Sequence, residues 1–360
     1  MTNLTQYGYT ETAPPPAGLI PGRVTELQRE RYTVVTEHGE VPATLKGAFY
    51  HSAQLKEDLP TVGDFILLQY NESGVSLVAE LLPRRTKFSR ADFLGHSAGH
   101  VKTAHEQVVA ANFDYVFRVT SLNRDFRVNR IMRYLTQAQS THAQPVVILT
   151  KADLVDDFSH YVDEVEAVAP GVPVHAVSSY TGFGLDALGP YLSPGKTIVF
   201  LGMSGVGKSS LVNALMDDTV MAVRETRKED TSKGSHTTTH RQMLMLPCGA
   251  MIIDTPGMRE LGLYDAEEGI KAVFGDVEDL FSQCKFTNCR HETEPGCAVK
   301  VALADGTLTA KQWERYLAQK RESKFIESKT AYKRERVAGK KEMAIHSRKN
   351  KKHKGGQIDE

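Results

Sequence analysis

The chain has 360 residues, of which 41% are hydrophobic, and it carries 44 basic and 44 acidic side chains. This length is typical of two or three domains rather than one. No apolar run approaches the roughly 18 residues needed for a membrane-spanning helix, and the polar N-terminus lacks the basic start and apolar core of a secretory signal. We therefore expect a cytoplasmic protein with no membrane partner.

The net charge of zero hides an asymmetry along the chain. Between Lys311 and Lys354 there are 16 Lys and Arg against 5 Asp and Glu. The rest of the chain has the matching acidic surplus. A basic C-terminal region favours contact with a polyanion, although a solvated charged helix would give the same pattern.

The N-terminal quarter of the chain has the pattern of a small β-domain. Residues 1–20 are polar and contain three consecutive prolines, which predicts a disordered lead-in. Residues 21–85 contain five short alternating segments: Gly22–Leu27, Arg31–Glu37, Val41–Leu45, Phe65–Tyr70 and Ser76–Leu82. Five such strands favour a barrel of the oligonucleotide-binding (OB) type, with a small β-barrel of another kind as the alternative. Residues 86–111 are polar and predict a flexible linker.

From residue 112 to 264 the pattern becomes α/β. Six apolar segments are predicted to be strands: Tyr115–Val119, Val146–Leu149, Val174–Val177, Ile198–Leu201, Met243–Leu246 and Met251–Ile253. Segment Arg127–Ala138 places Val128, Ile131, Met132 and Leu135 on one helical face. This alternation predicts a mainly parallel sheet with helices on both sides.

A phosphate-binding loop follows the fourth of these strands. Residues 202–209, GMSGVGKS, match the pattern G-x-x-x-x-G-K-S. Its glycines allow backbone N–H groups to surround the phosphates at the start of a helix. The candidate phosphate ligands are Gly202, Ser204, Gly205, Val206, Gly207, Lys208, Ser209 and Ser210. Lys208 is expected on the β- and γ-phosphates, and Ser209 on Mg²⁺.

Three further motifs complete a guanine nucleotide site. Asp254 and Gly257 form D-x-x-G after a strand, for Mg²⁺ and the γ-phosphate. Thr150-Lys151-Ala152-Asp153 resembles N-K-x-D, in which the Asp carboxylate accepts bonds from guanine N1–H and the N2 amine, donors that adenine lacks. Thr150 replaces the usual Asn, which braces the loop and touches the base. Ser178-Ser179 resembles the last guanine contact.

The order of these motifs is unusual, because the base-recognising motifs precede the phosphate loop. The chain then begins at the fourth strand of the usual GTPase fold, a circular permutation that nearby chain ends tolerate. Two alternatives remain open: an RNA-binding or chaperone protein with vestigial hydrolysis, and an ATP-using P-loop enzyme, given Thr150.

A cysteine and histidine cluster lies beyond the nucleotide motifs. Cys284, Cys289, His291 and Cys297 follow the pattern C-x4-C-x-H-x5-C. Three thiolates and one imidazole predict one closed, structural Zn²⁺ site, with ordinary buried cysteines as the alternative. Cys248 stands apart and is expected to be a core or loop thiol. Lys311–Ala344 is predicted to be helical, and its Trp313 and Tyr316 fit a helical core better than an RNA-stacking surface.

With these motifs in place, the sequence resembles the ribosome small-subunit-dependent GTPase A (RsgA) family, over about Pro21 to Ile345. The motif order, the cysteine–histidine cluster and Gly234-Ser235-His236-Thr237-Thr238-Thr239 carry this resemblance. It implies an OB barrel at 21–85, a permuted GTPase at 112–264 and a zinc-binding, mainly helical domain at 265–345. The charge pattern adds a basic tail at 346–360.

The resemblance also implies an activity and partners. It implies a monomeric GTP hydrolase that cycles between GTP and GDP and acts in late maturation of the small (30S) ribosomal subunit. Such a protein would bind rRNA, and the subunit would stimulate its hydrolysis. Met258 stands where many GTPases have a water-orienting Gln, and the resemblance points to His236 as its replacement. Thr238 or Thr239 would close over Mg²⁺.

Overall fold

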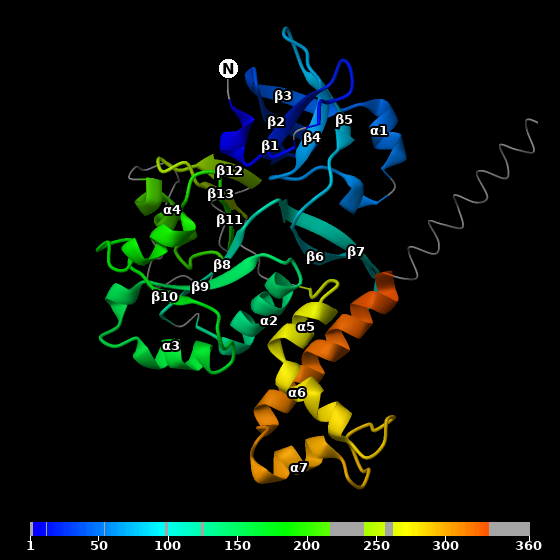
Figure 1. The fold of residues 1–360 in the computed structure, drawn as a ribbon, viewed down its shortest axis with the longest axis vertical. Helices are drawn as coiled ribbons and strands as arrows, with labels where there is room; N and C mark the ends of the chain where they lie inside the picture. The colour runs from blue at the N-terminus through cyan, green and yellow to red at the C-terminus, as the bar shows by residue number, and fades with distance from the viewer. Residues whose placement is uncertain are drawn as a thin grey trace, which may run out of the picture.

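The computed structural model describes residues 3–11, 13–53, 55–97, 100–123, 126–216, 241–255 and 262–330; side chains at 51, 52, 93–97 and 100–104 lie outside this description. Figure 1 shows a β-barrel at one end, an α/β body in the middle and a helical domain at the other end. None of the described helices is long and apolar enough to cross a membrane.

The N-terminal barrel has the five strands that the sequence predicts. They are β1 (Ile20–Gln28), β2 (Arg31–Thr36), β3 (Gly39–Leu45), β4 (Phe65–Gln69) and β5 (Ser76–Leu81). The strands pair in the order β1–β2–β3–β5–β4, and β4 pairs back with β1 to close the barrel. Helix α1 (Gly47–Ser52) and η2 (Lys56–Asp58) lie between β3 and β4. Buried Val24, Val34, Ile66, Leu68 and Val78 fill the interior. The predicted OB-type barrel is confirmed.

The expectation of a disordered lead-in is wrong for the described part of residues 1–20. Leu4–Tyr7 form a 3-10 helix, η1, and the Asn3 side chain caps its start. Leu4 is buried, and the Tyr9 ring packs on Phe65 of the barrel. These apolar contacts outweigh the polar composition of the segment.

The expectation of a flexible linker at 86–111 is also wrong. This segment forms a hairpin of β6 (Lys87–Ser97) and β7 (His100–Ala111). Its polar side chains pair across the two strands: Ser89 Oγ donates to Glu106 Oε1 at 2.6 Å, and Arg90 Nε donates to Gln107 Oε1 at 2.8 Å. Cross-strand pairs of this kind stabilise a hairpin that looks like a polar loop in the sequence.

The central body has the mainly parallel sheet that the sequence predicts. Its strands are β8 (Tyr115–Ser121), β9 (Gln144–Thr150), β10 (Val174–Ala176), β11 (Thr197–Leu201), β12 (Arg241–Met245) and β13 (Met251–Asp254). The order is β10–β9–β8–β11–β13–β12, and the β12–β13 pair is antiparallel. Strand β12 also pairs with β1, so one continuous sheet joins the body to the barrel.

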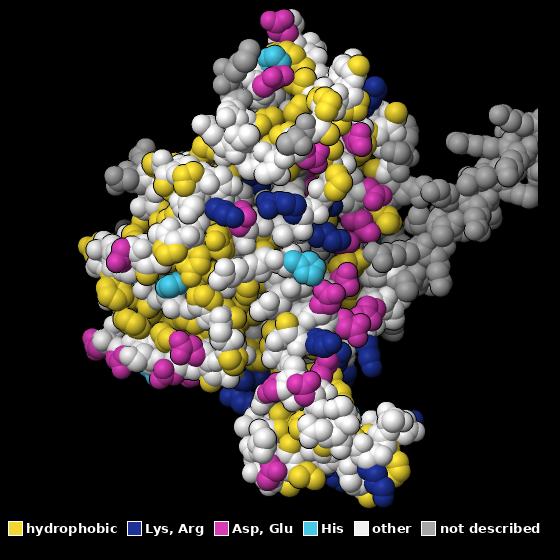
Figure 2. Space-filling view, in the orientation of Figure 1, with side chains coloured by type: hydrophobic (Ala, Val, Ile, Leu, Met, Phe, Trp, Pro, Cys, Tyr) yellow, Lys and Arg dark blue, Asp and Glu magenta, His cyan; other side chains and the backbone are white. Residues whose placement is uncertain are grey.

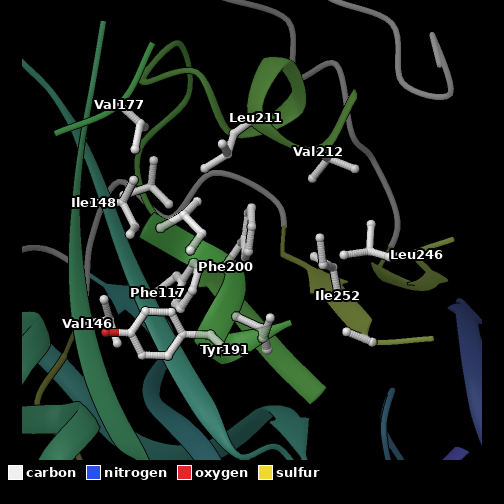
Figure 3. Close-up of a cluster of buried hydrophobic side chains, with 14 of the residues drawn as sticks. Phe117, Val146, Ile148, Val177, Tyr191, Phe200, Leu211, Val212, Leu246 and Ile252 are labelled. Carbon is white, nitrogen blue, oxygen red and sulfur yellow. The ribbon is translucent and has the colours of Figure 1, made fainter. Parts of the chain in front are cut away.

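Helices cover both faces of this sheet. Helices α2 (Val128–Gln139) and α3 (Ser159–Glu166) pack on one face, where Ile131 and Leu135 of the predicted stripe are buried. Met132 of the same stripe is buried against the helical domain instead. Helix α4 (Lys208–Met216) and η4 (Asp186–Tyr191) cover the other face. Figure 3 shows this second layer, with Leu211 and Val212 of α4 close to Phe200 and Ile252 of the sheet.

The C-terminal domain is helical, as predicted. It contains α5 (Glu267–Val273), α6 (Gly275–Asp279), η5 (Leu280–Gln283), α7 (Ala298–Asp305) and a helical segment at 310–330. The rest of the predicted helix Lys311–Ala344 lies outside the described residues. Trp313 and Tyr316 stack on each other and pack edge-on against Phe281. The two aromatic side chains therefore belong to the core of this domain.

Candidate nucleotide and metal sites

The phosphate loop connects β11 to α4, as its motif requires. A side chain at Gly202 would place its Cβ 2.6 Å from the Val119 carbonyl oxygen, so only glycine fits there. Gly207 has a φ of 94°, a conformation that glycine adopts without strain. The Val206 side chain is buried in the core between sheet and α4. The packing of Val206 in this core therefore holds the phosphate loop in place.

Side chains hold several carbonyl groups of this loop. Lys151 Nζ donates to the Gly205 carbonyl at 2.9 Å, and the Thr150 hydroxyl donates to the Val206 carbonyl at 2.5 Å. Lys208 Nζ donates to the Gly202 and Met203 carbonyls, at 2.9 Å each. In a planar trans peptide the C=O and the following N–H point in opposite directions. Holding these carbonyls therefore orients the loop N–H groups for an anion.

Lys208 is the buried cation of this loop, with a relative exposure of 8%. Burial lowers the pKa of Lys208 from 10.5 to about 8; the charge of Asp254 opposes this shift, and that of Arg118 adds to it. A lysine whose charge is poorly solvated in the free protein gains most from a phosphate that neutralises it.

Two loops form the candidate base site beside the phosphate loop. Asp153 lies in η3 (Ala152–Leu154), directly after Lys151, which has a left-handed φ of 62°. The buried Ser178 hydroxyl donates to Asp153 Oδ1 at 2.5 Å and accepts N–H bonds from Tyr180 and Thr181, at 3.2 Å each. Ser178 therefore orients the exposed Asp153 carboxylate, a role that sequence reasoning missed. Ser179 follows in the same loop, half-buried.

The acidic motif begins at the end of β13. Asp254 is buried, and the Thr255 hydroxyl donates to the Phe200 carbonyl of the neighbouring β11 at 2.7 Å. The charge of Asp254 acts on Lys208, so the two motifs are electrostatically connected. The remaining predicted residues of the site, Gly257, His236, Thr238 and Thr239, lie outside the described residues.

These motifs meet at one edge of the sheet. Thr150 ends β9 and residues 151–153 follow it, residues 178–179 follow β10, the phosphate loop follows β11, and Asp254 ends β13. Parallel strands bring their carboxyl ends to the same edge, where α/β proteins bind ligands. The hydrogen bonds from Thr150 and Lys151 to the phosphate loop show that the base and phosphate motifs are in contact.

Arg118 is a further charged residue near the site that the sequence reasoning missed. It lies in β8 with a relative exposure of 1%, and its guanidinium carbon lies 4.0 Å from the centre of the Tyr134 ring. Its Nη1 donates to the Val119 carbonyl, next to the phosphate loop, at 2.7 Å. A lone charge within the apolar segment YVFRVTS was the available signal.

A separate cleft of about 880 Å³ lies where the barrel, the body and the helical domain meet. Figure 2 shows side chains of both charges along this junction. The charged lining residues are Glu57, Asp58, Arg84, Arg85, Lys87, His142, Asp265, Glu267 and Glu268. Acidic groups predominate there and no nucleotide motif reaches it, so this cleft is a poor site for phosphates.

The predicted metal ligands come together in the helical domain. The donor atoms of Cys284, Cys289, His291 and Cys297 all lie within 4.8 Å of one another. His291 Nδ1 lies 3.6 Å from Cys284 Sγ and 3.5 Å from Cys297 Sγ. Sulfur and nitrogen ligands of a tetrahedral Zn²⁺ ion stand about 3.5 Å apart, so this donor set fits zinc. Cys248, by contrast, is an exposed loop thiol.

The electrostatics of His291 suit a metal ligand. Burial lowers the pKa of His291, while the charge of Glu294 opposes this effect, so the neutral imidazole that binds metals is favoured. The Phe281 ring stacks on the imidazole with a centroid distance of 4.3 Å. The aromatic core thus fixes the orientation of this ligand.

The fold and the sites define a P-loop nucleotide hydrolase with circularly permuted motifs. A family model described as RsgA GTPase matches residues 81–264. The chain belongs to this family and is a GTPase. It is 45% identical, over 91% of its length and 85% of the relative's, to "Small ribosomal subunit biogenesis GTPase RsgA 1" of Listeria innocua. It is 40% identical to the RsgA protein of Methanosarcina acetivorans, over 93% and 89% of the two chains.

Solved structures agree with this fold. The crystal structure of YjeQ from Thermotoga maritima is similar, with a TM-score of 0.58 and 28% identity over 83% of this chain and 96% of that chain. A structure described as YloQ, a circularly permuted GTPase, has a TM-score of 0.54 at 22% identity, over 87% and 97%. The predicted permutation is therefore confirmed.

Proposed function

We propose that this GTPase acts in biogenesis of the small ribosomal subunit, binding the subunit and its rRNA and hydrolysing GTP when the subunit stimulates it. The observation that carries the proposal is the convergence of base and phosphate motifs at one sheet edge, in a chain whose relatives bear that role in their names. We place the protein in the cytoplasm as a monomer, with the barrel at 21–85, the GTPase domain at 112–264, the helical domain at 265–345 and the basic tail at 346–360.

The proposed guanine nucleotide site follows from the contacts above. Asp153, oriented by Ser178, accepts bonds from guanine N1–H and N2, and Lys151 packs its stem over the base. The residues proposed around the nucleotide are Thr150, Lys151, Asp153, Ser178, Ser179, Gly202, Ser204, Gly205, Val206, Gly207, Lys208, Ser209, Ser210, Asp254 and Gly257. Lys208 exchanges its carbonyl partners for the phosphates.

The proposed chemistry depends on positioning a water and neutralising charge. Ser209, with Thr238 or Thr239, would hold Mg²⁺, and Asp254 would act on it through water; the metal would neutralise charge on the phosphates. Met258 cannot orient a water as the usual glutamine does, and the family resemblance points to His236 as the proposed water-orienting residue. Positioning of this kind lowers the barrier without covalent chemistry.

The proposed Zn²⁺ ion is structural. Four protein donors would fill its tetrahedral shell and leave no position open to water. Cys284 and Cys289 follow η5, and Cys297 is the N-cap of α7, so the ion would tie these two helices together. We therefore assign it folding of the helical domain and no part in hydrolysis.

Side-chain hydrogen bonds hold residues 263–264, which follow the acidic motif, and they support coupling between the nucleotide site and the helical domain. Gln137 of α2 bonds both backbone groups of Tyr264, at 2.8 Å each. Glu322 of the 310–330 helix accepts from the Leu263 N–H at 3.3 Å and from Arg133 of α2 at 2.7 Å. A change at the γ-phosphate would reach the helical domain through this segment, as in order–disorder switches.

The proposal predicts nucleotide-dependent docking. The full chain should sediment with purified small ribosomal subunits in the presence of a non-hydrolysable GTP analogue, and mostly remain in the supernatant with GDP. Lys208→Ala, which removes the phosphate-binding cation, should lose this difference. Equal sedimentation with both nucleotides would refute the switch, and no sedimentation with either would refute the partner.

A further inference from the structure

Thr150 carries a hydroxyl group where the usual residue of its motif, asparagine, carries an amide. It ends β9 and is 2% exposed. Its hydroxyl lies 2.5 Å from the Val206 carbonyl oxygen of the phosphate loop and 3.2 Å from the Thr120 carbonyl oxygen of β8. A hydroxyl has one hydrogen, and both of these neighbours are acceptors. The hydrogen is therefore used inside the protein, and none remains to donate to a base.

The bond to Val206 has a consequence on the other side of the same peptide. The Val206 carbonyl and the Gly207 N–H belong to one planar trans peptide and point in opposite directions. Fixing the carbonyl toward Thr150 therefore directs the Gly207 N–H away from Thr150. Gly207 also lies directly against this side chain, because a Cβ there would stand 3.5 Å from Thr150 Oγ1.

Lys151 acts on the preceding peptide in the same way. Its Nζ holds the Gly205 carbonyl at 2.9 Å, which orients the Val206 N–H. Two adjacent residues of the base-recognising motif thus hold two adjacent peptides of the phosphate loop. The base is left to the Asp153 carboxylate, which Ser178 orients.

We propose that Thr150 is a positioning residue for phosphate binding and does not recognise the base: its hydroxyl aligns the Gly207 N–H and leaves the guanine N7 acceptor uncontacted. This inference rests on the proposed guanine nucleotide site. It makes residue 150 a determinant of affinity for the phosphates, whereas selectivity for guanine comes from Asp153.

The test compares the full-length wild type with Thr150→Val and Thr150→Ser by titration calorimetry. The ligands are GDP, 7-deaza-GDP, in which a C–H group replaces the N7 acceptor, and ADP. Valine keeps the shape of threonine but has no hydroxyl, so Thr150→Val should weaken GDP and 7-deaza-GDP about tenfold and equally, a change of ~1.4 kcal/mol. Thr150→Ser keeps the hydroxyl and should regain most of that affinity. Thermal unfolding of each variant checks that the fold persists.

Three results would overturn this inference while leaving the proposed guanine nucleotide site intact. A loss confined to GDP, with 7-deaza-GDP bound as in the wild type, would show that the hydroxyl contacts N7. Wild-type affinity of Thr150→Val for GDP would show that the hydroxyl does not hold the loop. Equal losses in Thr150→Ser and Thr150→Val would show that keeping the hydroxyl does not keep the affinity, so packing at residue 150 and not its hydrogen bond would be responsible. If wild-type protein binds ADP as tightly as GDP, the proposed guanine site fails first, and this inference fails with it.

Discussion

Replacing Gln137 by leucine should release the segment that follows the acidic nucleotide motif. The Gln137 side chain is 3% exposed; its Nε2 donates to the Tyr264 carbonyl and its Oε1 accepts from the Tyr264 N–H, at 2.8 Å each. Leucine has similar size but can make neither of these two hydrogen bonds. Removing one partner of a buried polar group costs about 1–3 kcal/mol, so the loss of both bonds should make local opening around Tyr264 easier by roughly 2–4 kcal/mol.

Hydrogen exchange read by mass spectrometry measures this opening directly. A change of roughly 2–4 kcal/mol corresponds to about 30- to 1,000-fold faster exchange in the peptide containing Leu263 and Tyr264. Gln139→Leu, in the same helix at a half-buried position, is the matched control and should exchange at the wild-type rate. If Gln137→Leu exchanges no faster than the control, Gln137 does not hold the segment, and the proposed coupling loses its main support.

Three other predictions concern the two sites. Because the pKa of free Lys208 is about 8 and a bound phosphate would raise it, the contribution of Lys208 to GDP affinity should be constant below pH 8 and fall above it. Calorimetry should therefore show weak binding with a flatter profile for Lys208→Met, and parallel profiles for the two proteins would contradict this. Cys289→Ser should eliminate zinc in metal analysis and unfold the helical domain while GDP affinity is retained. The control Cys248→Ser should keep one equivalent of zinc, and zinc-free wild-type protein would exclude the metal. Asp153→Asn should weaken GDP binding at least about tenfold and should bind xanthosine diphosphate in preference, because its C2 carbonyl accepts a hydrogen bond from the new amide. An unchanged preference for GDP would show that Asp153 does not recognise the base.

The elements with a strong local signal were predictable from the sequence. All five barrel strands and all six strands of the central sheet fall within a few residues of the predicted segments, because each has clear alternation or a short apolar run. The phosphate loop and the cysteine cluster were predictable because their chemistry needs fixed residue types at fixed spacings.

Features that depend on distant partners were not predictable. The β6–β7 hairpin is stabilised by polar pairs such as Ser89 with Glu106, and nothing local distinguishes these residues from a loop. Gln137 looks like a surface residue of an amphipathic helix, yet it is buried against Tyr264, 127 positions away. The bond from Ser178 to Asp153 likewise depends on how β9 and β10 lie side by side.

Multiple-turnover GTP hydrolysis with and without purified small ribosomal subunits tests the central claim most directly. The account predicts slow hydrolysis by the free protein, since Met258 cannot orient water, and at least about tenfold faster turnover with small subunits, equivalent to ~1.4 kcal/mol of barrier. Large subunits should give no increase, Lys208→Ala should stay at background, and His236→Ala should bind the subunit but lose most of the stimulation. Equal rates for the wild type with and without small subunits would contradict the account, whatever the phosphate loop binds.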